Sequence, residues 1–177
     1  IRAPRVPRDL GGGRVNPYAG IAALGLEPLA RGWGNSHSPA LAEHIARARV
    51  VIEVGSFQGA SVAWMAAHNE TARFYCVDTW LGSPEISADD MGGIGYQFGR
   101  PMLLERFLSN MVAAGINDRV TPIIQTSTSG AKILRAKGIA ADLIYIDAGH
   151  DYLECYGDLV SYTPLLAKGG VMIADDY

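Results

Sequence analysis

The feature that most constrains this chain is the alternation of short, β-branched apolar runs with segments long enough to form helices. Five such runs begin at Val50, Phe74, Val120, Leu143 and Val171. Runs of this kind are typical of strands that are buried on both faces, and strands separated by helices form right-handed βαβ units around a parallel sheet. The sequence therefore predicts a doubly wound α/β fold with strand order 3-2-1-4-5.

Helices are predicted between these strands from the spacing of apolar residues. The expected helical segments are 39–48, 56–69, 101–114, 129–136 and 151–167. Pro101 is expected to open its helix and Gly115 to close it, because proline suits the first helical turn and glycine the C-cap. Pro164 is expected to begin a new turn, and Gly169-Gly170 to end the last helix.

One domain is expected from 177 residues, because two well-cored domains would need a longer chain. We assign this domain to residues 35–177. Residues 1–34, which proline and glycine interrupt repeatedly, are expected to form an N-terminal arm with a short helical turn within 21–26. The segment 81–99 is expected to be a long loop, either a solvated face or a lid over the substrate.

Composition excludes several classes of function. A net charge of −3 argues against a nucleic-acid binder, which normally carries a basic face. Cys76 and Cys155 lie far apart and lack C-x-x-C spacing, which argues against a disulfide scaffold or a thiolate zinc site. No apolar run approaches the roughly 20 residues that span a bilayer. We expect a cytoplasmic protein that binds neither nucleic acid nor membrane.

The residues that follow the first two strands indicate a nucleoside ligand, because open parallel sheets bind ligands beyond the carboxyl ends of their strands. Gly55 permits a tight turn, and Gly59 lets the next helix approach the sheet and a ligand. Phe57 occupies the place of the second glycine in the dinucleotide fingerprint G-x-G-x-x-G, where its side chain obstructs a pyrophosphate. Asp78 can accept hydrogen bonds from ribose hydroxyls, and Glu53 is an acid that is costly to bury without a partner.

Three aspartates follow strands that are expected to be neighbours. Asp147 ends the fourth strand, and Asp175 and Asp176 end the fifth. Carboxylates gathered at one edge repel one another unless a cation or protons neutralise them. Oxygen ligands without histidine or cysteine favour Mg²⁺ or Mn²⁺ over zinc, and such an ion lowers the pKa of a bound hydroxyl. The alternative is a solvated strand end.

His150 lies three residues beyond Asp147 in the same loop. An imidazole takes up a proton near neutral pH, which suits a general base. The alternative is that His150 and Asp151 only cap the helix that follows.

Four segments carry a resemblance to a known family. They are EVGSFQGAS, VDTW, IDAGHDY and GGVMIADDY, and they resemble the class I S-adenosylmethionine-dependent methyltransferases. Within these, the sequence is most similar to the metal-dependent O-methyltransferases, in the branch of macrolide-sugar methyltransferases and cephalosporin-hydroxylase-like proteins. The resemblance covers about 33–177. It implies a Rossmann-like fold, S-adenosylmethionine and Mg²⁺ or Mn²⁺ as cofactors, and a small-molecule hydroxyl acceptor such as a sugar or another alcohol or diol.

The resemblance also implies residues for binding the cofactor. The methionine moiety would be lined by Glu53, Gly55, Ser56, Gly59 and Ser61. The ribose would be held by Asp78, and the adenosine would be flanked by Thr79 and Trp80. The adenine would contact Ser127 and Thr128, and Asp147 would also lie beside the cofactor. For Trp80, packing in the core is an equally good interpretation.

The resemblance implies metal ligands and a base as well. Asp147, Asp175 and Asp176 match the positions that hold the metal, and His150 matches a position where the sugar branch carries histidine and the catechol branch lysine. The family continues beyond the double aspartate with a helix and two strands, whereas this sequence stops at Tyr177. We therefore expect a C-terminally incomplete sheet with an exposed edge strand, which invites association such as a homo-oligomer.

Two other functions remain open. One is a non-catalytic module that binds S-adenosylmethionine. The other is an NAD-dependent oxidoreductase on the same architecture, against which Phe57 argues. The identity of the methyl acceptor does not follow from the sequence.

Overall fold

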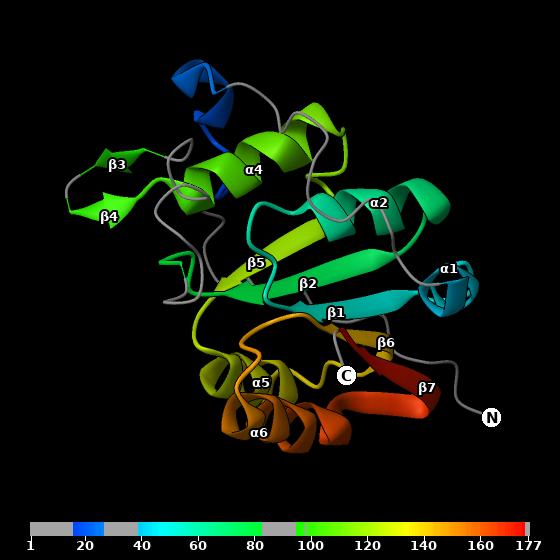
Figure 1. Ribbon diagram of the computed structural model, residues 1–177. Coiled ribbons are helices and arrows are strands. Elements are labelled where there is room, and N and C mark those ends of the chain that lie inside the picture. Colours follow the sequence, from blue (N-terminus) through cyan, green and yellow to red (C-terminus); the bar gives the residue numbers. More distant parts are fainter. Residues whose placement is uncertain (1–15, 27–38, 83–94, 98, 176–177) are drawn as a thin grey trace.

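The computed structural model describes residues 16–26, 39–82, 95–97 and 99–175. At its centre is a five-stranded parallel sheet in the order β5-β2-β1-β6-β7 (Figure 1). The strands are β1 (Val50–Val54), β2 (Arg73–Asp78), β5 (Val120–Ile124), β6 (Ala141–Ile146) and β7 (Leu166–Ala174). Counted along the chain, this is the order 3-2-1-4-5, so the predicted fold class and strand order are confirmed.

Helices cover both faces of the sheet (Figure 1). The helices are α1 (Pro39–Ile45), α2 (Ala60–His68), α4 (Leu103–Ala113), α5 (Ser127–Ala136) and α6 (Tyr152–Tyr162). Val51 belongs to the buried cluster with α1, α2 and α4, and the next residue, Ile52, belongs to the cluster with α5 and α6. This alternation makes the strand apolar on both faces. Each fully buried apolar side chain contributes about 1.5–3 kcal/mol to the stability of the folded state.

Two helices begin later than the sequence predicts. Residues 56–59 form a loop before α2, because Phe57 and Gly59 adopt positive φ angles of 43° and 83° that no right-handed helix contains. Pro101 does not open α4. It lies instead in a short antiparallel hairpin of β3 (Tyr96–Gln97) and β4 (Arg100–Pro101), and the helix starts at Leu103.

The prediction that the last helix reaches residue 167 is wrong. α6 ends at Tyr162, and Pro164 lies in a 3₁₀ turn (η2, Thr163–Leu165), as expected for a residue that begins a new turn. Gly169 and Gly170 do not end a helix, because they lie within β7. There they form an irregularity between two register pairs, with Gly169 at a φ of 81° and Gly170 packed against the Ala141 carbonyl.

The described part of the predicted arm packs on the domain. Ile21–Leu24 form a 3₁₀ helix, η1, which confirms the short helical turn, and Ile21 is buried with α4. The Tyr18 hydroxyl donates a hydrogen bond of 2.9 Å to the Val120 carbonyl. The rest of residues 1–34, and residues 83–94 and 98 of the predicted loop at 81–99, lie outside the described residues. Among the described helices, none combines the length and the apolar character needed to cross a membrane.

The turn after β1 gives a prediction about stability. Gly55 has a φ of 87°, and a Cβ atom added there would lie 2.0 Å from the Asp147 carbonyl oxygen. We expect Gly55→Ala to lower the free energy of unfolding by roughly 3 kcal/mol or more, because backbone strain and a backbone clash combine. Urea unfolding followed by circular dichroism measures this loss.

The matched control is Gly115→Ala, which has a φ of 68° but no atom within 4 Å of the added Cβ. It carries only the left-handed strain, which costs about 1–2 kcal/mol. Equal losses in the two variants would contradict the importance of the close approach at Gly55.

Candidate functional site

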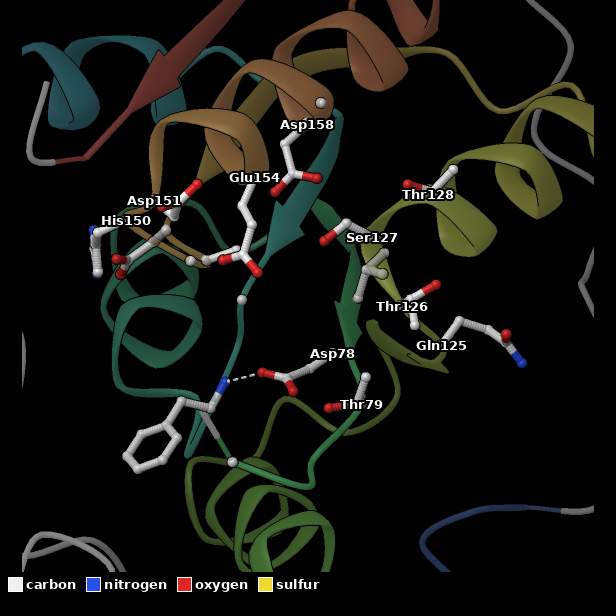
Figure 2. Close-up of a pocket in the computed structure, with 18 of the residues that line it drawn as sticks. Asp78, Thr79, Gln125, Thr126, Ser127, Thr128, His150, Asp151, Glu154 and Asp158 are labelled. Carbon is white, nitrogen blue, oxygen red and sulfur yellow. Dashed lines mark hydrogen bonds between the residues drawn. The ribbon is translucent and has the colours of Figure 1, made fainter. Parts of the chain in front are cut away.

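A cavity of about 860 Å³ lies beyond the carboxyl ends of the strands (Figure 2). Its wall is built from the loops that follow β1, β2, β5 and β6, together with the first turns of α6. This is the place where open parallel sheets bind ligands, and the volume suits a molecule of nucleoside size.

The cavity brings many of the predicted site residues together. The predicted residues that line it are Gly55, Asp78, Thr79, Ser127, Thr128, Asp147 and His150. The predicted residues that the wall does not include are Glu53, Ser56, Gly59, Ser61, Trp80 and Asp175. Asp176 lies outside the described residues.

The Asp78 carboxylate joins the two loops that form one side of the cavity. Its Oδ2 accepts a hydrogen bond of 2.8 Å from the Phe57 backbone N–H (Figure 2), and its Oδ1 accepts one of 2.7 Å from the Trp80 backbone N–H. Phe57 and Trp80 are the non-glycine residues with positive φ in the described chain, at 43° and 52°, a conformation that costs about 1–2 kcal/mol each. Burial raises the pKa of Asp78, and the backbone donors oppose that rise.

Asp78 therefore offsets the strain of both loops. It also lines the cavity, so one carboxylate both holds the loops and forms part of the wall that a ligand meets.

Trp80 acts at the site through its backbone rather than its ring. The residue is 1% exposed, and its indole packs on Phe107 with ring centroids 4.8 Å apart. The indole N–H donates a hydrogen bond of 2.8 Å to the Phe57 carbonyl. The structure thus places the Trp80 side chain in the core, which is the alternative that the sequence left open.

Gly59 is required by packing between helices. A Cβ atom added there would lie 2.5 Å from Met111 Cε and 2.9 Å from the Phe107 ring, both on α4. The sequence predicted that Gly59 lets the helix approach the sheet and a ligand, whereas the close approach in the structure is between the start of α2 and α4.

Glu53 is a fully buried acid between two strands. Its register partners are Cys76 on β2 and Tyr145 on β6, and its Oε1 accepts a hydrogen bond from the Ser61 hydroxyl. Its Oε2 and the Ser56 hydroxyl have no hydrogen-bond partner within the described part of the chain. Burial raises the pKa of Glu53 to about 8, and the negative charges of Asp147 and Asp78 add to the rise. Glu53 Oε2 is therefore an unused acceptor just before the Gly55 turn, and it belongs to a carboxyl group that titrates near neutral pH.

Asp147 and Asp175 follow neighbouring strands, as predicted. The Asp147 N–H donates to the Val54 carbonyl at 2.8 Å, and the Asp175 N–H donates to the Ile146 carbonyl at 2.9 Å. Burial, the charges of both aspartates and a hydrogen bond to Asp175 raise the pKa of Tyr145. Both carboxylates therefore act on one hydroxyl.

The described residues contain no group of three or more histidine, cysteine, aspartate or glutamate side chains that could hold a metal ion. The third predicted ligand, Asp176, is not among them. The predicted three-aspartate cage stays a prediction.

His150 and Asp151 lie at the start of α6. Asp151 is the N-cap, because its Oδ1 accepts a hydrogen bond of 2.9 Å from the Leu153 N–H, which confirms the capping interpretation for this residue. His150 is exposed and lies on the rim of the cavity (Figure 2).

The cavity wall is strongly acidic. Its carboxylates are Asp78, Asp147, Asp151, Glu154 and Asp158, and no lysine or arginine lines it among the described residues. Such a wall concentrates negative potential, which favours a cationic ligand and disfavours a pyrophosphate. Glu154 and Asp158 were not predicted as site residues from the sequence. Their spacing from Asp151, three and seven residues, would have placed all three on one helical face.

Residues 52–177 match the protein family described as a methyltransferase domain. No curated protein matches the sequence.

Solved structures of O-methyltransferases share the fold. An O-methyltransferase family protein from Burkholderia thailandensis is 18% identical with a TM-score of 0.55, over 76% of this chain and 35% of that chain. The O-methyltransferase from Bacillus cereus in complex with SAH is 19% identical with a TM-score of 0.53, over 92% of this chain and 66% of that chain. TomG from Streptomyces achromogenes, an O-methyltransferase of tomaymycin synthesis in complex with SAM, is 17% identical with a TM-score of 0.55, over the same shares. This chain spans between 35% and 66% of the length of these proteins.

The buried Glu53 predicts a particular dependence of stability on pH. Its pKa is about 8 in the folded protein and 4.5 ordinarily, so between these pH values the folded state binds a proton that the unfolded state lacks. The free energy of unfolding should therefore fall as pH rises through this window, by at most about 1.4 kcal/mol per pH unit. In Glu53→Gln, which is neutral, this part of the fall should vanish. Urea unfolding at pH 5.5, 6.5 and 7.5 measures the slope.

Glu70→Gln, at an exposed glutamate, is the control and should keep the parent slope. If parent and Glu53→Gln show parallel slopes, Glu53 does not carry the raised pKa.

Proposed function

This chain belongs to the methyltransferase domain family, and on that premise we propose that it transfers the methyl group of S-adenosylmethionine to a hydroxyl oxygen of a small molecule, with assistance from a divalent metal ion. The observation that carries the proposal is the charge of the cavity, whose wall has five carboxylates and, in its described part, neither lysine nor arginine.

The charge of the cavity supports S-adenosylmethionine as the methyl donor. This molecule carries a sulfonium and an ammonium cation, which carboxylates stabilise. An NAD-type dinucleotide carries two negative phosphates, and these would meet acids in the wall and the Phe57 side chain where the dinucleotide fingerprint has glycine. Two of the similar O-methyltransferases are described with SAM or SAH bound.

The buried acceptors support a place for the methionine moiety. Glu53 Oε2 and the Ser56 hydroxyl are without partners in the described part of the chain and flank the Gly55 turn. An ammonium group beside Glu53 would favour its ionised form and would satisfy an acceptor whose isolation is costly. Asp78 would accept from the ribose hydroxyls, and Ser127 and Thr128 would lie at the adenine.

Asp147 and Asp175, with Asp176, would hold the metal ion. The fit is supported by two carboxylates that follow neighbouring strands and both act on Tyr145, an accumulation of negative charge that a cation relieves. Their oxygen ligands suit Mg²⁺ or Mn²⁺. Such an ion would polarise the acceptor hydroxyl and lower its pKa.

His150 would act as the general base, because it lies on the cavity rim beside Asp147 in sequence. It would take the proton of the acceptor hydroxyl as the oxygen forms its bond to the methyl carbon. The carbon–sulfur bond breaks in the same step, and its electron pair goes to sulfur, which leaves a neutral thioether and an ether product. Asp78, Ser127 and Thr128 would hold the donor so that oxygen, carbon and sulfur lie in line, and alignment of this kind supplies much of the rate. We propose a sugar or another alcohol or diol as the acceptor.

The choice of nucleotide is the first test. We expect S-adenosylmethionine to bind the parent protein, and its affinity to weaken as salt rises from 50 to 500 mM, because carboxylates contribute to binding. We expect no measurable binding of NAD⁺ or NADH. Isothermal titration calorimetry measures all three, and tighter binding of NAD⁺ than of S-adenosylmethionine would overturn the proposed donor.

The second test separates an enzyme from a binding module. Transfer of a labelled methyl group to a panel of sugars and diols should require Mg²⁺ or Mn²⁺ and should fall roughly 100-fold or more in His150→Ala, the usual contribution of a general base. Asp147→Asn should weaken Mg²⁺ binding, followed by calorimetry, at least tenfold.

Glu154→Gln is the matched control, because it also removes one acid from the wall but none of the proposed metal ligands. Binding of S-adenosylmethionine without a metal response and without transfer would indicate a non-catalytic binding module.

A further inference from the structure

One buried acid of the cavity wall has no individual role in the function proposed above. Asp158 lies within α6, is 5% exposed and lines the cavity. A carboxylate in such a position is costly unless a hydrogen bond satisfies it. Its partner therefore indicates its role.

That partner is Ser127, the first residue of α5. Figure 2 shows the Asp158 carboxylate directed toward Ser127 and the cavity, and the Ser127 hydroxyl favours the ionised form of that carboxylate, which lowers its pKa. The Ser127 carbonyl also accepts a hydrogen bond of 2.8 Å from the Tyr162 hydroxyl. Helix α6 thus meets Ser127 at two points, with the Asp158 carboxylate on the side of its hydroxyl and the Tyr162 hydroxyl bonded to its carbonyl.

Ser127 belongs to a turn that forms part of the cavity wall. Residues 125–128 all line the cavity, and Thr126 caps α5 by accepting a hydrogen bond from the Ser129 N–H at 3.4 Å. That cap is long, so it holds the turn weakly. Backbone hydrogen bonds from Gly130 to Thr126 and from Gln125 to Asp78 fix the turn at its two ends, and the contacts from α6 restrain Ser127 between them.

The groups around Asp158 bring the pKa of its carboxyl into a range that a binding experiment can cover. Burial raises its pKa to about 6, the hydrogen bond from Ser127 opposes the rise, and the charge of Glu154 adds to it. From its own helix it faces Glu154 and Tyr162, and the charge of Asp158 in turn contributes to a raised pKa at Tyr162. From α5 it meets the Ser127 hydroxyl, while Lys132 and Arg135 of that helix are exposed.

We propose that Asp158 is a positioning residue that acts through Ser127 to hold the 125–128 turn in the shape that receives the purine end of the methyl donor. The proposal rests on the proposed function, because that function assigns the adenine to this turn. Protonation of Asp158 removes the negative acceptor and weakens its hold on the Ser127 hydroxyl. The affinity for the donor should therefore fall as pH falls through about 6, the pKa at Asp158.

The test compares S-adenosylmethionine binding in the parent and in Asp158→Asn by calorimetry at pH 5.0, 6.0 and 7.5. In the parent we expect affinity to drop by roughly three- to tenfold between pH 7.5 and 5.0, the worth of one hydrogen bond. Asp158→Asn should bind more weakly than the parent at pH 7.5 and should lose the inflection near pH 6. Any dependence due to Glu53 should persist at higher pH, because the substitution leaves Glu53 intact.

Two further variants separate the loss of the contact between Asp158 and Ser127 from a general change in the charge of the cavity wall. Ser127→Ala removes the partner hydroxyl and leaves Asp158, so it should reproduce the weaker binding at pH 7.5. Glu154→Gln alters the same wall without removing the contact, so it should keep the inflection and move it to lower pH. Parent-like pH profiles in both Asp158→Asn and Ser127→Ala, at parent melting temperatures, would overturn the proposal.

A second readout does not need the ligand. Amide hydrogen exchange at Ser129 and Gly130, whose N–H groups donate to Thr126 of the turn, should become faster in the parent, relative to the intrinsic rate, when pH falls below 6, and should be fast at every pH in Asp158→Asn. Unchanged exchange in the variant would overturn the positioning role. If exchange behaves as expected but the parent does not bind S-adenosylmethionine, the proposed function fails and the restraint on the turn stands.

Discussion

The site depends on a carboxylate that two strained loops share. Asp78 accepts the backbone N–H of Phe57 from the loop after β1 and that of Trp80 from the loop after β2, and both donors have positive φ. Without those hydrogen bonds, nothing in either loop would offset the strain of a residue with a large side chain at a positive φ. The Trp80 indole closes the arrangement by donating to the Phe57 carbonyl. One acid thus shapes the cavity and also forms part of its wall.

Two other acids are buried on opposite sides of the sheet. Glu53 belongs to the face that α2 and α4 cover, and Asp158 to the side that α5 and α6 cover. Burial raises the pKa of each, to about 8 and about 6. Proteins rarely keep such groups for stability, because an apolar residue would cost less to bury. Asp158 lines the cavity, and Glu53 lies beside the Gly55 turn, which lines it. These positions are consistent with the proposed roles, a bound cation near Glu53 and a restrained turn at Asp158.

Much of the frame could be predicted from local patterns. Apolar runs of five or six residues located the strands, and the expected order of those strands brought Asp78 and Asp147 to one edge. The start of α2 was predicted too early, because the helical spacing of 56–59 does not reveal that Asp78, about twenty residues away, holds Phe57 in a left-handed conformation. Gly169 and Gly170 were predicted to end a helix from their local sequence. Only the pairing of this segment with β6 shows that they form an irregularity within a strand.

The sequence by itself therefore determined the α/β class, the order of the strands and the acids at their ends, because each of these follows from periodicity within one segment and from the rules of parallel sheets. Only the tertiary structure decided which of those groups face the cavity. It placed the Trp80 ring in the core, turned Gly59 toward α4 and brought Asp158 against Ser127. These are contacts between segments that are distant in the chain, and a local sequence pattern does not determine which side chains pack against each other across such distances.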